Sequence, residues 1–264
     1  VIVFGQGVRG VALATLIAQG ISAVISFALL MRKLKGYREE EKVRLYSGEM
    51  AASMVKIAVP STLQQSIVHV GILLVQAVIN SFGSTALAGY SAGMRIESLS
   101  IVPMLAMGNA MSTFTAQNMG AGNIDRVKKG YQMCYVIVLT AGAVLCIMYQ
   151  LAGGMFVSLF LDSGSSEAYN IGLSYVRFLS FFYSFIGLKA STDGLLRGAG
   201  DVVAFTVANL VNLAIRVSVT NLFAPVYGIQ VAWMAVPLGW AANYVISFGW
   251  YLTGKWKNVR VIRK

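Results

Sequence analysis

The sequence predicts an all-α, polytopic membrane protein with about seven transmembrane helices. Of its 264 residues, 57% are hydrophobic and only 12% are charged, whereas about a quarter of the residues in a soluble domain are charged. The apolar residues are gathered in long runs, each near the ~20 residues that a helix needs to cross a bilayer. In addition, Lys and Arg are concentrated in every second gap between these runs, a pattern typical of a membrane protein with a fixed orientation.

The apolar runs are the expected transmembrane helices. In chain order they are residues 8–31, 54–82, 86–118, 131–160, 169–193, 202–226 and 228–254. Lys and Arg follow the first, third, fifth and last of them, whereas the gaps at 81–85, 162–168 and 224–228 contain neither residue. By the positive-inside rule the basic segments, and with them the C-terminus, are cytoplasmic. The net charge of +11 is thereby explained without a nucleic-acid partner.

The first and last apolar runs are similar to each other, which indicates an internal repeat. Placing Gly7 on Gly228 without gaps also aligns Val24–Phe27 with Val245–Phe248. Parallel repeats recur in transporters, with the binding site at the interface between the repeats. On this hypothesis the chain is partial, and most of an N-terminal lobe is missing from it.

The repeat gives a division of the chain into four parts. The expected parts are the last transmembrane helix of the first lobe at 1–31, a cytoplasmic linker at 32–53, a six-helix C-terminal lobe at 54–254 and a basic cytoplasmic tail at 255–264.

Polar residues at helical spacing mark one face of the run 54–82. Gln65, His69, Gln76 and Asn80 follow at steps of four, seven and four, which keeps them on one side of a helix. Because a polar group in hydrocarbon must find a partner or water, this face is expected to line a cavity. His69 is there either a protonatable or substrate-contacting residue or a neutral histidine that bonds to a neighbouring helix.

A second polar face lies on the run 202–226, where Asn209, Asn212 and Arg216 follow at steps of three and four. An unpaired charge at this depth costs at least ~2.5–3.5 kcal/mol, so Arg216 needs a partner or a wet cavity. Glu97 is the expected partner, because it is the carboxylate predicted at a comparable depth. Arg95 competes for the same carboxylate, although residues two apart on a helix do not face each other.

Lys189, Asp193 and Arg197 follow at i,i+4 spacing, which predicts a local ion-pair ladder. This structural interpretation is favoured over a role for Asp193 in an ion pathway. Pro103 and Pro237 interrupt two apolar runs and are expected where a helix bends, either for alternating access or as static kinks.

The sequence lacks the residues of several enzyme classes. It has no Gly-x-x-x-x-Gly-Lys-Ser/Thr phosphate loop, and one His with two distant Cys provides too few ligands for a catalytic zinc site. No nucleophile–base pair is evident. We therefore expect no enzymatic activity, no bound metal and no cofactor.

Several motifs, in order and spacing across nearly the whole chain, resemble the multidrug and toxic compound extrusion family. They are Ala92–Glu97, Gly108–Thr113, Ala116–Asn123 and Leu196–Asp201, followed by Asn209, Asn212, Arg216, Gly228, Trp233 and Pro237. The resemblance implies two six-helix lobes related by a pseudo-two-fold axis, of which this chain supplies the second. It also implies an antiporter of the plasma (inner) membrane that exports small cationic or amphipathic drugs in exchange for Na⁺ or H⁺.

The resemblance and the polar faces together predict the substrate and ion pathway. Its expected residues are Gln65, His69, Gln76, Asn80, Arg95, Glu97, Asn109, Asn209, Asn212 and Arg216. Some Na⁺-coupled members carry carboxylates in the seventh and tenth helices, where this chain has Gln65, His69 and Gln76 and the apolar run Phe181–Phe185. Coupling is therefore expected to use a carboxylate of the missing lobe, with Glu97 as the candidate in this one.

Two other functions fit the same helices. A flippase for lipid-linked glycans would share the fold, but it needs a strongly cationic cavity to hold pyrophosphate, and the buried Arg residues here are few. A membrane scaffold would suit a short chain, but it gives no reason for polar faces on two long helices.

Overall fold

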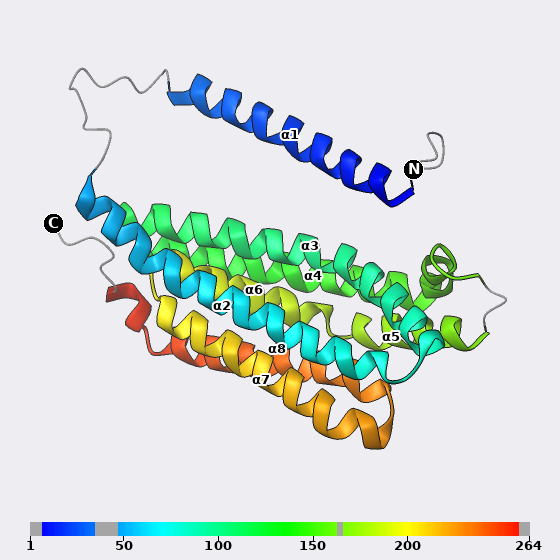
Figure 1. Cartoon of the computed structure of the whole chain (residues 1–264). Helices are drawn as coiled ribbons and strands as arrows, with labels where there is room; N and C mark the ends of the chain where they lie inside the picture. The colour runs from blue at the N-terminus through cyan, green and yellow to red at the C-terminus, as the bar shows by residue number, and fades with distance from the viewer. Residues whose placement is uncertain (1–6, 35–46, 163–165, 259–264) are drawn as a thin grey trace. The chain divides into compact units, whose positions relative to one another are not determined.

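The computed structural model describes residues 7–34, 47–162 and 166–258, and every regular element in these ranges is helical (Figure 1). The predicted all-α fold is thus confirmed. The chain divides into two compact units, Val1–Ser53 and Met54–Lys264. Most of the predicted linker, and the end of the predicted basic tail, lie outside the described residues.

The first unit contains one long helix, α1, at Gly7–Leu34. Its residues Ala12–Leu34 are long and apolar enough to cross a membrane. Large apolar side chains such as Leu16, Val24 and Phe27 are exposed within this unit, as expected for a helix that meets lipid or another membrane helix. Its assignment to a first lobe stays a prediction.

The helices of the second unit follow one another through short turns. They are α2 (Gly48–Asn80), α3 (Ser84–Gly120), α4 (Ile124–Ser158), α5 (Ser166–Ser180), α6 (Tyr183–Gly198), α7 (Val202–Tyr227), α8 (Gln230–Leu252) and a 3₁₀ turn, η2 (Lys255–Asn258). Among the described residues, five helices of the chain can cross a membrane by length and composition, and six can if α5 and α6 form one span. The described Ser66–Asn80 segment of α2 is a shorter apolar helix.

The expected span at 169–193 is not one continuous helix, because α5 and α6, which together are long and apolar enough for one span, meet at a break of 53°. Neither Pro nor Gly marks the break, which falls at Phe181 and Phe182. The Gln150 side chain of α4 donates from Nε2 to the backbone oxygen of Arg177 at 2.8 Å and to Ser180 Oγ at 2.8 Å. A neighbouring helix thus bonds a carbonyl in the last turn of α5, and such outside partners are what permit broken helices inside membranes.

The prolines do not coincide with a break. Pro103 lies inside α3 and Pro237 inside α8, and both helices are continuous. A proline removes one backbone donor, yet both helices continue past their proline.

Small residues bring α3 and α6 into close contact. A Cβ on Gly194 would lie 2.1 Å from the backbone oxygen of Gly108, and a Cβ on Gly198 would lie 2.2 Å from that of Ser112. Such contacts are the usual means of tight packing between membrane helices. They hold α6 and its polar residues against α3. Helix α8 packs against both α6 and α7 (Figure 1).

Candidate ion and substrate pathway

Glu97 is a buried carboxylate on α3, only 8% exposed. It accepts a hydrogen bond from the Tyr175 hydroxyl of α5. Tyr175 comes this close to α3 because residue 93 is a glycine, where a Cβ would lie 2.6 Å from the tyrosine ring. The ring of Tyr90 meets that of Tyr175 edge-on at 5.3 Å. The carboxylate is therefore enclosed by aromatic rings and held by one hydroxyl.

Arg216 lies in the same region but does not touch the carboxylate. Within the described ranges, ion pairs join only Lys128 to Asp125 and Lys189 to Asp193. The predicted Glu97–Arg216 interaction is thus not seen as a salt bridge in the described residues.

Arg95 is exposed and does not compete for Glu97. Its position two residues from Glu97 places the two side chains on different sides of α3. The competition of Arg95 for this carboxylate is therefore not seen, and its place in the pathway stays a prediction.

The polar face of α7 packs against α8. A Cβ on Gly239 would lie 2.3 Å from Asn212 Oδ1 and 2.9 Å from Arg216 Cγ, so only glycine fits there. Asn212 Oδ1 is buried and has no hydrogen-bond partner in the described part of the chain. A buried acceptor without a partner is costly, and it is a natural contact for a water molecule or a ligand.

A second polar cluster joins α6, α7 and α8 around Asp193. Its Oδ2 accepts from Lys189 Nζ at 3.0 Å and from Asn209 Nδ2 at 3.2 Å, and its Oδ1 accepts from Ser247 Oγ at 2.7 Å. Lys189 Nζ also donates to Asn209 Oδ1 at 3.1 Å. The Lys189 and Asp193 side chains are only 13% and 7% exposed. Asp193 therefore bonds a partner from each of the three helices.

The predicted ladder is half correct, because Arg197 does not pair with Asp193. Its Nη2 instead donates to Asn109 Oδ1 at 2.8 Å, and its guanidinium lies 5.7 Å from the ring centre of Phe205. The close packing of α3 on α6 brings Asn109 within reach, which the spacing along α6 alone does not indicate. Asn109 thus takes part in a contact between α3 and α6.

The polar face of α2 does not join either cluster. His69 and Asn80 are exposed, and Gln76 donates from Nε2 to Asn80 Oδ1 at 3.1 Å within the helix. No hydrogen bond or ion pair in the described residues links these side chains to Glu97 or Asp193. The side chain of Gln65 lies outside the described residues.

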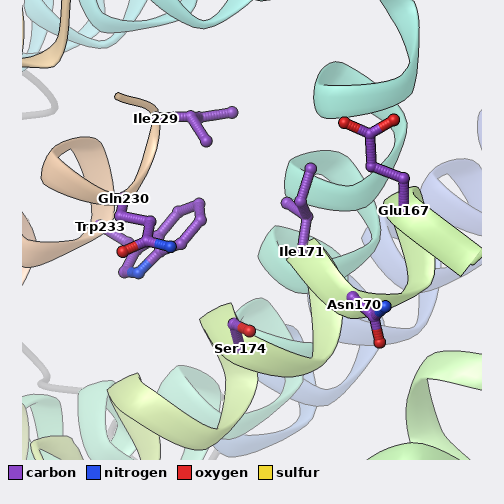
Figure 2. A pocket seen from close by; sticks show the side chains of 7 residues that line it. All are labelled: Glu167, Asn170, Ile171, Ser174, Ile229, Gln230 and Trp233. Carbon is purple, nitrogen blue, oxygen red and sulfur yellow. The ribbon is translucent and has the colours of Figure 1, made fainter. Parts of the chain in front are cut away.

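A pocket of about 400 Å³ opens between the start of α5 and the start of α8 (Figure 2). Its lining residues are Glu167, Asn170, Ile171, Ser174, Ile229, Gln230 and Trp233. This volume suits a small organic molecule. The Trp233 ring meets that of Tyr175 edge-on at 5.7 Å, so two rings connect the pocket wall to Glu97.

Sequence reasoning missed Glu167, Tyr175 and the cavity role of Trp233. Tyr175 lies on an apolar run without a polar stripe around it, so helical periodicity gives no signal for it. Glu167 lies within the gap 162–168, which has no basic residue, so its predicted position at the outer surface is the signal that could have found it.

Comparison with known proteins supports one family. The chain is 27% identical to the probable multidrug resistance protein YpnP of Bacillus subtilis, over 98% of this chain and 58% of that protein. It is 21% identical to the probable multidrug resistance protein NorM of Thermotoga maritima, over 98% of this chain and 56% of the relative. The chain thus spans little more than half the length of these relatives.

Solved structures share the fold. A transporter of the MOP superfamily from Pyrococcus furiosus matches with a TM-score of 0.81 at 20% identity, over 97% of this chain and 58% of that one. An outward-facing multidrug resistance transporter of the MATE family in the MOP superfamily matches equally, with a TM-score of 0.81. The MatE family model matches residues 60–222. Because this match covers more than half of the chain, the protein belongs to the MatE family.

Proposed function

We propose that this chain is the C-terminal part of a secondary-active multidrug efflux antiporter. Relatives over nearly its whole length are named multidrug resistance proteins, and the family match covers most of the helical lobe. The whole transporter would exchange small amphipathic or cationic drugs for Na⁺ or H⁺ across the cytoplasmic membrane. An N-terminal lobe, outside this chain, would form the other wall of the cavity.

The observation that carries the proposal is a buried carboxylate next to a pocket. Glu97 is nearly inaccessible and reaches the pocket wall through Tyr175 and Trp233. An ionisable group at membrane depth is costly and is usually functional. No step of enzymatic catalysis is required of it.

The geometry suggests how ion and drug binding would be coupled. A proton or cation that binds Glu97 neutralises the carboxylate to which the Tyr175 hydroxyl donates. The Tyr175 ring also packs on Trp233 in the pocket wall. The shape of the pocket wall would then differ between the loaded and the empty carboxylate. A ligand that prefers one of these two states shifts the population towards it, which is the requirement for exchange.

Ethidium efflux by the whole transporter tests the proposal. Cells that express it are expected to accumulate less ethidium than vector controls, and Glu97→Gln should lower the efflux rate by at least about tenfold, a loss of ~1.4 kcal/mol in the coupled step. Asp125→Asn is the matched control, because Asp125 is an exposed carboxylate on α4 paired with Lys128. It should keep the parental rate.

Two outcomes would contradict the proposal. Unchanged ethidium accumulation with confirmed surface expression would favour a lipid-linked glycan flippase or a scaffold. Full efflux by Glu97→Gln would leave drug export in place but remove Glu97 from the coupling step.

A further inference from the structure

The cluster around Asp193 has the composition of a small cation site. It presents the two carboxylate oxygens of Asp193, the Asn209 amide oxygen and the Ser247 hydroxyl oxygen, contributed by α6, α7 and α8. Ser247 is fully buried, and so is its neighbour Asn243 on α8. Carboxylate, amide and hydroxyl oxygens with one net negative charge are the ligands that hard cations prefer.

The cation in this cluster is a side chain. Lys189 Nζ lies 3.0 Å from Asp193 Oδ2 and 3.1 Å from Asn209 Oδ1, so the ammonium is bonded by the same oxygens that would hold a free ion. An ammonium is a compact point charge with three donors and no acceptor. It therefore neutralises the carboxylate and uses the amide oxygen at the same time.

The chain also prevents Lys189 from leaving. Its side chain is only 13% exposed, and its attachment to α6 four residues before Asp193 keeps the amine at very high effective concentration. A free monovalent cation would have to displace it without any gain in charge. In this structure the Lys189 ammonium thus occupies the place of a free cation.

We infer that the Asp193, Asn209 and Ser247 cluster is a monovalent-cation site that the Lys189 ammonium fills permanently. This lobe therefore exchanges no ion with the solution at this place. The inference does not rest on the efflux activity, because the site is defined by its own contacts and is tested through stability.

Removal of the amine should convert the cluster into a site for free Na⁺. Lys189→Met keeps the length of the side chain but leaves Asp193 as a buried, unpaired carboxylate, which is destabilising. Na⁺ bound there would stabilise the folded state by mass action. In purified protein, the melting temperature of Lys189→Met should rise by about 3 °C or more when choline chloride is replaced by NaCl at equal ionic strength.

Two controls isolate the site. In the parent protein, the change in melting temperature between NaCl and choline chloride reports Na⁺ binding at any other site. The change in Lys189→Met should be larger. In the double variant Lys189→Met with Asp193→Asn, the cluster is neutral, so the extra shift should disappear.

The inference is overturned by a Na⁺ shift in Lys189→Met no larger than in the parent, or by an equal shift in the double variant. If Lys189→Met is recovered only from cells extracted in NaCl and not in choline chloride, the inference is supported. If neither Lys189→Met nor Lys189→Ala is recovered in either salt, Na⁺ does not replace the amine and the inference fails.

Discussion

At the scale of single residues, two of the buried carboxylates of the lobe, Glu97 and Asp193, have different surroundings. Glu97 has one neutral donor, Tyr175, and no ion pair among the described residues. Asp193 has a direct cationic partner and two neutral donors. The two carboxylates thus differ in their contacts: Glu97 is bonded by a neutral hydroxyl alone, whereas Asp193 is paired with an ammonium.

The hydroxyl of Tyr175 should matter for transport more than for folding. Tyr175→Phe removes the donor to Glu97 but keeps the ring contacts with Tyr90 and Trp233. A hydrogen bond to a charged group contributes about 1.5–3 kcal/mol, so ethidium efflux should fall by about tenfold or more. Tyr90→Phe is the matched control and should stay near the parental rate. Equal rates for the two variants would show that the Glu97 contact is not used.

At the scale of elements, the break between α5 and α6 is the least expected feature. Helix α5 ends at Ser180 and α6 begins at Tyr183, with no residue that intrinsically breaks a helix between them. The break is supported from outside, by Gln150 of α4 and by the Ser180 hydroxyl, which donates to the backbone oxygen of Arg177 at 2.7 Å. Tyr175, before the break, bonds Glu97, and Asp193, after it, bonds partners on α7 and α8.

Gln150 should therefore contribute to stability. Gln150→Leu removes one of the two side-chain donors to the Arg177 carbonyl and also the bond to Ser180 Oγ, and each such hydrogen bond contributes about 0.5–1.5 kcal/mol. The melting temperature should drop by at least about 2–4 °C. Gln132→Leu, an exposed position on the same helix, should leave it unchanged. If the melting temperature drops equally in both variants, the loss of a polar side chain explains the effect, and the contact at the break does not.

At the scale of the whole molecule, the chain is one helical lobe plus one separate helix, and its relatives are nearly twice as long. The alternation of basic and non-basic gaps gives its orientation. The start of α5, with the pocket residue Glu167, is predicted to lie outside the cell, and the start of α4, with Asp125, inside. This orientation remains a prediction that accessibility can test.

Cysteine labelling checks the orientation. In a background with Cys134 and Cys146 replaced by Ala, Glu167→Cys should react in intact cells with a membrane-impermeant maleimide, and Asp125→Cys should react only after permeabilisation. Both positions are exposed, so accessibility within the fold does not distinguish them. The reverse result would invert the assigned topology and place the pocket on the cytoplasmic side.

The sequence by itself determined the helical class, most helix positions and the family resemblance. These follow from composition, from apolar runs of bilayer length and from local motifs, all of which are properties of neighbouring residues. The resemblance that rests on Ala92–Glu97 and Asn209–Arg216 is confirmed by the family match over residues 60–222. The transport pathway through His69 and Gln76 stays a prediction.

Only the tertiary structure decided which polar groups meet. Spacing along a helix says which residues share a face, but not which helix lies opposite or how closely it approaches. Glycines at 93, 194 and 239 bring Tyr175 to Glu97, α6 to α3 and α7 to α8. For the same reason Arg197 bonds Asn109 and not Asp193, and a glutamine on α4 holds a break that no local signal marks. These contacts depend on packing between segments far apart in the chain, and packing distances are not encoded in periodicity.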